Sequence, residues 1–368
     1  MRDVPVLEPY PAQAEIVLGG ACDLSCSYCF VDHRGPEAAD PTAIERAVER
    51  VLELPRRELT FTFTLLEPFT RAGLWMRLVE RILSGADKRG KSVQIVATTN
   101  GLRLDRRLRR FLEGARSRVR LNVSLDGAPA SHDLHRRGAL HAGSFRQAWE
   151  NVRQLPPGEL RAVYTATPDR LDRLAADLGF IAGLGLRRID VFPDAFAPWT
   201  AARLRQLGSV LSPLLGAASA ASEAMEWRLL NRLWGPTHHG KVLIDADGSF
   251  YLYEWARLLP PGRRARYRLG DARRVDWSRR LKLHETLLGA LASRGWFKRE
   301  RGLRRLAWPT PLLLRHGRSG PALEDALRRY GRLAELMVGL ASGAPPQVLS
   351  ASDRARLQAG FARPQPAP

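Results

Sequence analysis

The sequence places all of its cysteines in one short stretch. Cys22, Cys26 and Cys29 follow the pattern Cys-x3-Cys-x2-Cys, and these are the only three cysteines in the 368 residues. Disulfide pairing would leave one thiol over, and residues 1–5 lack the apolar core of a secretory signal peptide. We therefore interpret the stretch as a metal site in a reducing compartment and expect a cytoplasmic protein. Three thiolates can hold three irons of a 4Fe-4S cube and leave the fourth iron open to a substrate.

A structural zinc site is the main alternative for these cysteines. His33 lies four residues after Cys29 and would complete a Cys3His tetrahedron. Structural zinc sites usually draw their ligands from two separated pairs, which this stretch does not offer. Free cysteines also pack as small hydrophobic residues, but three at this spacing with none elsewhere argue against chance. We therefore favour an iron–sulfur site and expect His33 to be a loop residue.

Length, hydropathy and charge argue against a membrane-spanning protein and against a nucleic-acid-binding protein. The length allows one large domain with appended elements. No run of about twenty apolar residues is present, so we expect no membrane-spanning helix. The formal net charge is +20, but only five of the 58 basic residues are lysines, and the arginines are spread along helix faces without interleaved aromatic residues. This pattern favours a solvated basic surface over a nucleic-acid site, and the surface would also attract an acidic peptide.

Strand-like and helix-like segments alternate through the first half of the chain. Strands are expected at 15–19, 59–66, 93–98, 119–125, 162–165 and 188–192. Helical spacing of apolar residues separates them, near 41–52, 74–82, 105–114, 144–155 and 169–181. Six consecutive units imply an α/β fold with a parallel sheet that curls into a partial (β/α)6 TIM-like barrel. Catalytic groups in such barrels lie at the C-terminal ends of strands, where the cysteine loop falls.

The alternation stops after about residue 200, where we expect a small α+β C-terminal extension. The predicted divisions are a lead-in at 1–13, the partial barrel at 14–200, connecting helices at 201–235, a β-containing region at 236–300, and a helical extension and tail at 301–368. Two adjacent histidines, His238 and His239, are expected to be surface or hairpin residues and not metal ligands.

The cysteine pattern, with the aromatic Tyr28 directly before the last cysteine, closely resembles the cluster-binding signature of radical S-adenosylmethionine (SAM) enzymes. Glu67-Pro68 is similar to the Gly-Gly-Glu-Pro segment of that family, which meets the amino group of SAM. Here the two glycines are replaced by Leu65 and Leu66.

Two further segments resemble the peptide-modifying members of this family. Thr99-Asn100-Gly101 is similar to their Thr-Asn-Gly turn, and Ser124-Leu125-Asp126-Gly127, followed by Arg136, is similar to their fourth-strand segment. The resemblance implies one 4Fe-4S cluster on the three cysteines, and SAM as the second cofactor. The residues that it assigns to SAM are Tyr28, Glu67, Thr99, Asn100, Ser124, Asp126 and Arg136. Among these, Ser124 is assigned to the ribose region and Arg136 to the SAM carboxylate.

Acid–base groups are harder to assign from the sequence. We name Tyr164, Asp190 and Glu254 as candidate catalytic residues, because each is expected near the mouth of the barrel. For His132 and Asp133, loop-closing hydrogen bonds and a catalytic role are equally compatible with the sequence.

The resemblance spans residues 14–195 and extends to maturases with a C-terminal SPASM or twitch region. Residues 242–253 have the shape of their Asp-Gly hairpin without its cysteine, which implies a degenerate region without an auxiliary cluster. The implied function is reductive cleavage of SAM by an external one-electron reductant, followed by hydrogen abstraction from a ribosomally made precursor peptide, with an acidic leader as a candidate partner. Two alternatives remain, a radical SAM enzyme acting on a small molecule or RNA, and a non-catalytic binding subunit of a peptide-maturation complex.

Overall fold

The structure is a computed structural model of the chain. It describes residues 10–20, 22–31, 38–138, 142–194, 196–220, 226–228, 241–293 and 321–342. His33, which the sequence predicts to be a loop residue, and His238 and His239, predicted as surface or hairpin residues, lie outside the described residues.

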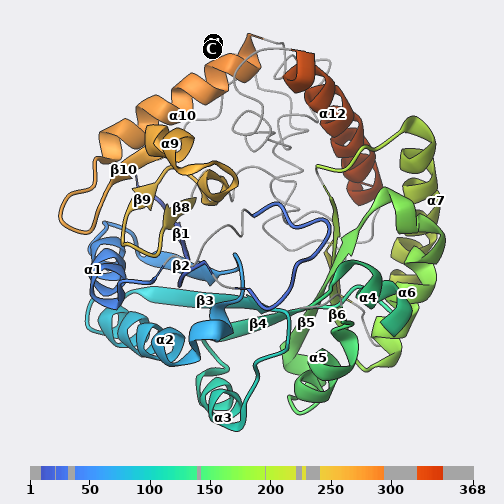
Figure 1. The fold of residues 1–368 in the computed structure, drawn as a ribbon, viewed down its shortest axis with the longest axis horizontal. Coiled ribbons are helices and arrows are strands. Elements are labelled where there is room, and N and C mark those ends of the chain that lie inside the picture. Colours follow the sequence, from blue (N-terminus) through green and yellow to red (C-terminus); the bar gives the residue numbers. More distant parts are fainter. Residues whose placement is uncertain are drawn as a thin grey trace, which may run out of the picture.

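A curved, mainly parallel sheet organises the molecule (Figure 1). Its central strands are β1 (Gln13–Ile16), β2 (Glu58–Phe63), β3 (Ser92–Thr99), β4 (Val119–Ser124), β5 (Leu160–Ala166) and β6 (Arg188–Pro193). Each pairs in parallel with the next along the chain, with Ala14 opposite Phe61 in the first pair. This arrangement confirms the predicted partial (β/α)6 barrel. The six strands therefore bring their carboxyl ends to one edge.

Helices cover the outer face of this sheet (Figure 1). They are α1 (Pro41–Leu52), α2 (Ala72–Asp87), α3 (Arg106–Ala115), α5 (Phe145–Val152) and α6 (Leu174–Gly183), with the short α4 (Pro129–His135) between β4 and α5. Three 3-10 turns, η1 (Pro68–Arg71), η3 (Pro157–Glu159) and η4 (Pro168–Arg173), flank the strands. The Asp40 side chain caps α1 by accepting from Ala43 N at 3.0 Å, with Pro41 at the first helical position.

The core lies between the helices and the sheet. Trp75 of α2 is fully buried, and its ring meets those of Phe63, Phe69 and Phe111 edge to face at centroid distances of 6.1, 5.1 and 5.7 Å. Burial of such large rings is a dominant favourable contribution to folding. This cluster fixes α2 and the preceding η1 turn against the end of β2, which carries part of the site.

Strands from the second half of the chain extend the sheet at both edges. β8 (Lys241–Ile244) pairs in parallel with β1, and β9 (Phe250–Tyr251) and β10 (Arg268–Gly270) continue from it in antiparallel pairs. β7 (Glu226–Arg228) pairs with β6 at the other edge. The described part of the C-terminal region is thus joined directly to the strand that leads into the cysteine loop.

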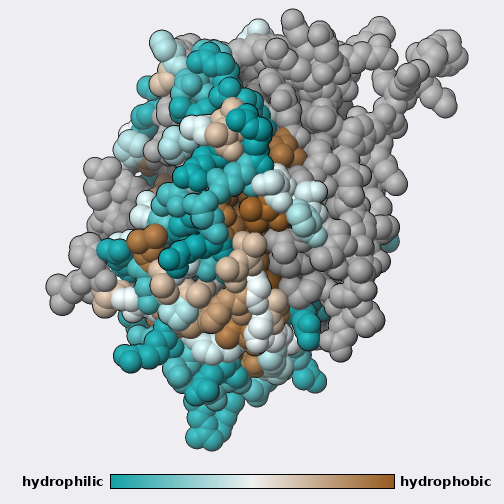
Figure 2. Space-filling model, turned by 90° about the vertical axis from the view of Figure 1, so that its right-hand side faces the viewer, coloured by the Kyte–Doolittle hydropathy of each residue, from teal (hydrophilic) through white to brown (hydrophobic). Residues whose placement is uncertain are grey.

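The remaining helical elements surround these edges. They are α7 (Ala201–Ala220), η5 (Glu254–Leu258), α9 (Pro261–Arg264), η6 (Ala265–Tyr267), α10 (Trp277–Ala292) and α12 (Pro321–Ser342). Helices α7 and α12 lie side by side (Figure 1), with Leu207 and Leu333 both fully buried. On the face seen in Figure 2, hydrophilic residues surround a smaller apolar area. None of the described helices has the length and apolar character needed to cross a membrane.

Candidate functional site

The cysteine loop follows β1 and lies at the carboxyl edge of the sheet. Ser25 N donates to Arg137 O at 2.8 Å, and Ser27 N donates to His135 O at 3.0 Å, so the loop is hydrogen bonded to the chain at the end of α4. A fork of hydrogen bonds from Arg103 to both carboxylate oxygens of Asp23, at 2.7–3.0 Å, fixes the loop on its other side. The loop is therefore held by segments that follow β3 and β4.

No disulfide bond joins the three cysteines of this loop, and their side chains are close enough for the charge of one to affect the ionisation of another. Burial raises the pKa of Cys22 to about 12, with Cys26 and Cys29 adding smaller contributions in the same direction. Burial also raises the pKa of Cys26, and the nearby Arg136 opposes that increase. Three thiols in one partly desolvated loop do not ionise readily alone, because each charge has to be compensated. A cationic iron–sulfur core supplies that compensation, so the donor set fits such a group.

The thiols are not gathered around a single point. Among the described residues, no three His, Cys, Asp or Glu side chains are grouped so that they could hold one metal ion. Three cysteines on three separate irons of a cube do not need to converge on one ion. The zinc alternative requires His33, which is outside the described residues.

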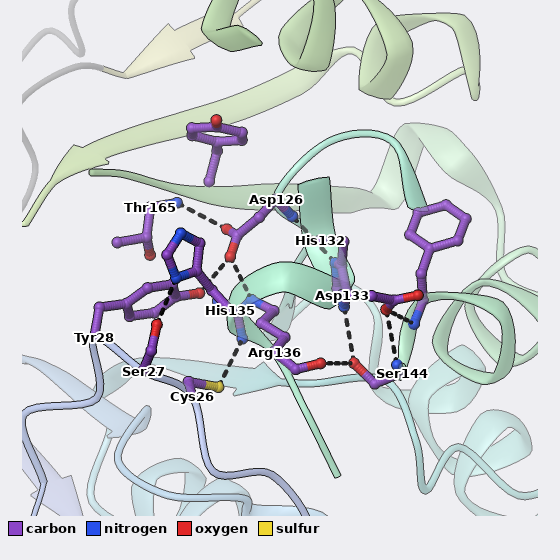
Figure 3. A network of polar contacts seen from close by, with 12 residues as sticks. Cys26, Ser27, Tyr28, Asp126, His132, Asp133, His135, Arg136, Ser144 and Thr165 are labelled. Atoms are coloured by element: carbon purple, nitrogen blue, oxygen red, sulfur yellow. Dashed lines mark hydrogen bonds and ion pairs between the residues drawn. The ribbon is translucent and has the colours of Figure 1, made fainter. Parts of the chain in front are cut away.

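Arg136 connects the cysteine loop to the end of β4 (Figure 3). Its Nε donates to Asp126 at 2.9 Å, its Nη1 lies 4.0 Å from Cys26 Sγ, and its guanidinium lies 5.4 Å from the centre of the Tyr28 ring. Asp126 is fully buried and also accepts from the Tyr28 hydroxyl and from Thr165 N. Burial would raise the pKa of Asp126, but the positive charge of Arg136 and these hydrogen bonds outweigh it and lower that pKa.

His132 and Asp133 make the loop-closing hydrogen bonds (Figure 3). Asp126 N donates to His132 Nδ1 at 3.3 Å, and His132 Nε2 lies 3.0 Å from Ser144 Oγ. Asp133 Oδ1 accepts from the backbone of Ser144 and Phe145, each at 2.8 Å, at the start of α5. Burial lowers the pKa of His132 to about 4, so the ring is neutral. Both side chains thus position the segment that carries Arg136.

Glu67 links the ends of β2 and β3. Its carboxylate accepts from Phe69 N at 3.0 Å, Thr99 Oγ1 at 2.9 Å and Asn100 N at 2.7 Å. The side chain is buried, and desolvation raises the pKa of Glu67 to about 7 despite these hydrogen bonds. A nearby positive charge favours the ionised form of such a carboxyl group. The protonated amino group of SAM would supply a charge of this sign.

An unpaired donor lies beside Glu67. Asn100 Oδ1 accepts from Leu102 N at 2.9 Å, whereas its buried Nδ2 has no hydrogen-bond partner. Buried donors are normally satisfied, so an acceptor on a bound molecule is expected here. Ser124, at the end of β4, is also buried at this edge, next to β3 and β5. These residues fit a polar cofactor bound at the carboxyl ends of the strands.

The backbone before Glu67 has an unusual conformation. Leu66 has φ of 59°, and it is the only non-glycine residue with positive φ among the described residues. A left-handed backbone costs an ordinary L-residue roughly 1–2 kcal/mol. Leu66 therefore adopts a conformation that glycine would adopt freely, at the position where the family pattern has glycine.

A cavity of about 540 Å³ opens next to the cysteine loop. Its walls include Cys29 and Phe30 from the loop, with Phe196 following β6. His135 contributes a polar wall, with Nδ1 at 2.5 Å from Ser27 Oγ and Nε2 at 3.4 Å from Asp169 Oδ2. The cavity thus combines aromatic walls with a few polar groups, as small-molecule and peptide sites commonly do.

The three candidate catalytic residues have different partners. Tyr164 receives a hydrogen bond from Arg170 at 3.2 Å, Asp190 is paired with Arg161 at 2.7 Å, and Glu254 forms an ion pair with Lys241. None of the three is among the described residues that line the cavity. Their catalytic roles remain predictions.

Sequence reasoning missed several groups of this site. His135 and Asp169 belong to no motif that we recognised, although His135 follows His132 by three residues and therefore shares its helix face. Glu15 accepts a hydrogen bond from Leu65 N in the turn before Glu67, whereas the sequence indicates only that it belongs to the first strand. Lys241 pairs with Glu15 from a distant part of the chain.

Comparison with known proteins identifies the domain that carries this site. The family model described as the radical SAM superfamily matches residues 16–190, from the end of β1 to β6. These residues form a radical SAM domain, and the cofactors of that family are a 4Fe-4S cluster and SAM. The curated proteins contain no match to the chain.

Solved structures share the fold over most of the chain. Native anSMEcpe with bound AdoMet has a TM-score of 0.68 and 16% identity, covering 90% of this chain and 100% of that one. The same protein with bound AdoMet and Kp18Cys peptide has a TM-score of 0.68 and 15% identity, covering 90% and 99%. Streptococcus suis SuiB bound to S-adenosylmethionine has a TM-score of 0.50 and 14% identity, covering 66% and 60%. At these identities the similarity establishes the fold.

Proposed function

We propose that this enzyme abstracts a hydrogen atom from a ribosomally made peptide during its maturation. The observation that carries the proposal is the cavity of about 540 Å³ that is lined by Tyr28 and Cys29 of the cysteine loop. The similarity of fold to anSMEcpe, which has been solved with AdoMet and a peptide, supports a peptide substrate. When bound, the reduced cluster and SAM supply a 5′-deoxyadenosyl radical, with the electron coming from an external donor.

The residues of the chain have separate tasks in this proposal. Cys22, Cys26 and Cys29 hold the cluster, and the buried guanidinium of Arg136 provides positive charge beside Cys26. Glu67 offers a carboxylate to the SAM amino group, and Asn100 offers its unpaired Nδ2 to a SAM oxygen.

Three more polar residues complete the proposed SAM site. Thr99 orients Glu67 through its hydroxyl, and Ser124 faces the ribose region. Asp126 orients Arg136 and the Tyr28 hydroxyl, so these residues keep the cofactor site in one arrangement before SAM enters.

The cavity is proposed to receive the reacting segment of the peptide. Its aromatic wall, where Phe30 and Phe196 lie 5.9 Å apart between ring centres, would cover an apolar portion of the substrate and keep water from the radical. An acidic leader would be attracted by the basic surface, since the chain carries a net charge of +20.

Transfer of isotope from peptide to cofactor tests this proposal. Anaerobically reconstituted enzyme is incubated with reductant, SAM and perdeuterated candidate peptides taken from the genes beside its own. Deuterium in 5′-deoxyadenosine would support a peptide substrate. Production of unlabelled 5′-deoxyadenosine with every peptide, together with deuterium transfer from a small molecule or RNA, would refute it.

A further inference from the structure

A buried group of charges joins the start of the barrel to its C-terminal strands. Glu15 of β1 is fully buried, and Lys241 of β8 and Glu254 of η5 are nearly so. Lys241 Nζ lies 3.0 Å from Glu15 Oε2 and is also paired with Glu254. A buried ammonium between two carboxylates stays charged, and removing one member would leave an uncompensated charge in the interior.

Glu15 also holds the end of β2. Its Oε1 accepts from two successive backbone donors, Thr64 N at 2.5 Å and Leu65 N at 3.1 Å. Its Oε2 accepts from the hydroxyl groups of Thr62 at 2.5 Å and Thr64 at 2.8 Å. All four donors lie within the last residues before Leu66, so one carboxylate fixes the approach to the left-handed turn.

Apolar contacts bind the same turn to the C-terminal strands. The Leu65 side chain is buried in a small cluster with Val17, which directly follows β1, and with Leu243 of β8, Tyr251 of β9 and Ala256 of η5. Leu65 and Leu66 stand where the family pattern has two glycines. The turn therefore takes its shape from contacts with neighbouring strands and not from glycine's freedom of conformation.

We propose that Glu15 and Lys241 are positioning residues for SAM. Glu15 holds Thr64 and Leu65 so that Leu66 keeps its left-handed backbone, and this places Glu67 at the ends of β2 and β3. Lys241, which also pairs with Glu254, holds the Glu15 side chain in the required orientation. The inference concerns SAM binding alone and does not depend on a peptide substrate.

Two substitutions with a rescue test this role. In Glu15→Gln, one of the two carboxylate oxygens is replaced by an NH2 group, which is a donor. In one orientation of the amide this NH2 faces the backbone N–H groups at the end of β2, and in the other it faces the ammonium group of Lys241. We expect SAM to bind the reconstituted protein about tenfold more weakly, measured by equilibrium dialysis, which corresponds to about 1.4 kcal/mol. Iron content per chain should stay unchanged. Adding Leu66→Gly should restore most of the affinity, because glycine adopts the turn without support.

A second variant leaves the charged group intact. Leu66→Val keeps an apolar side chain but disfavours positive φ more strongly, because valine is β-branched. It should weaken SAM binding with no change in iron content. Lys241→Met should behave as Glu15→Gln does.

A matched control removes a buried ion pair between β5 and β6. Arg161, near the start of β5, pairs with Asp190 at 2.7 Å, and Arg161→Met should leave SAM affinity unchanged. The proposal is overturned if Glu15→Gln or Leu66→Val binds SAM as tightly as the parent protein. It is also overturned if Leu66→Gly gives no rescue while Arg161→Met weakens binding equally, since the loss would then be general.

Discussion

At the scale of single residues, the site depends on charges that are buried and paired. The guanidinium of Arg136 contacts Asp126, the Tyr28 ring and Cys26. One cation therefore connects the cysteine loop to the end of β4. Glu67 is different, because its hydrogen-bond partners are neutral donors and no described residue forms an ion pair with it. A bound SAM amino group would supply that missing charge.

The raised pKa of Glu67 predicts a pH-dependent stability. Desolvation moves its pKa from 4.5 to about 7 in the folded protein. Between these values the folded protein binds more protons than the unfolded chain, so stability falls as pH rises through this window. The cost of the ionised group above about pH 7 is on the order of 3 kcal/mol, at roughly 1.4 kcal/mol per pKa unit.

Glu67→Gln removes this titration. In urea unfolding from about pH 5 to pH 8, the free energy of unfolding of the Gln variant should rise relative to that of the parent protein. The substitution also removes one hydrogen-bond acceptor, and this lowers the free energy of unfolding by the same amount at every pH, so it does not change the pH dependence. Parallel curves for the two proteins would contradict the assignment.

The resemblance to the family's motifs was sufficient to predict SAM-binding roles for Tyr28, Glu67 and Arg136, because each lies in or beside a recognisable motif. These roles remain predictions. Glu15 and Lys241 could not be named in this way. They are 226 positions apart and meet only because β8 pairs with β1. Each alone has the sequence context of an ordinary strand residue, so the charge pair is visible only in the fold.

At the scale of elements, the turn after β4 requires glycine. Gly127 has φ of 94°, and a Cβ there would lie 2.2–2.3 Å from atoms of the Asp177 side chain. Asp177 Oδ1 in turn accepts from Ala128 N at 3.1 Å, so it is not free to move aside. This turn directs α4 and therefore places Arg136.

Gly127→Ala should destabilise the protein by about 2 kcal/mol or more, through overpacking and the positive φ. The matched control is Gly114→Ala in the exposed part of α3, where a Cβ meets nothing within 4 Å. That change should stabilise the protein by roughly 0.5–1 kcal/mol, because alanine is the better helix former. Urea unfolding midpoints measure both changes in stability. Equal effects of the two substitutions would contradict the conclusion that the turn at position 127 requires glycine.

The six barrel strands were predictable because each is a short apolar run followed by a helical pattern. The attachment of β8 was not, since its four residues specify no partner and the intervening chain is long. The left-handed Leu66 was also unexpected. A leucine carries no sequence signal for positive φ, and only its surroundings impose that conformation.

At the scale of the whole molecule, the sheet topology determines where the site lies, and the net charge affects which partners approach the protein. The sheet gathers the cysteine loop, the SAM-motif residues and the cavity at one edge, while the chain as a whole carries a net charge of +20. A field of this sign increases the encounter rate with an anionic partner and is screened by salt.

Salt dependence therefore tests the proposed acidic leader. Binding of an acidic precursor peptide should weaken steadily as salt is raised from about 0.05 to 0.5 M, because the Debye length falls below the spacing of surface charges. A peptide of the same length with its Asp and Glu changed to Asn and Gln should show a much smaller dependence. Fluorescence anisotropy measures both, and equal salt dependence would count against an electrostatically held leader.

The central claim is that the cysteine loop forms the redox centre of a SAM-cleaving enzyme. The most direct measurement combines iron and sulfide counting with a reductant-dependent assay for 5′-deoxyadenosine, in the anaerobically reconstituted protein and in the variant with Cys22, Cys26 and Cys29 all changed to Ala. We predict about four irons per chain and formation of 5′-deoxyadenosine in the parent protein, with neither in the variant. A colourless parent protein without iron, or equal product formation by the variant, would contradict the account.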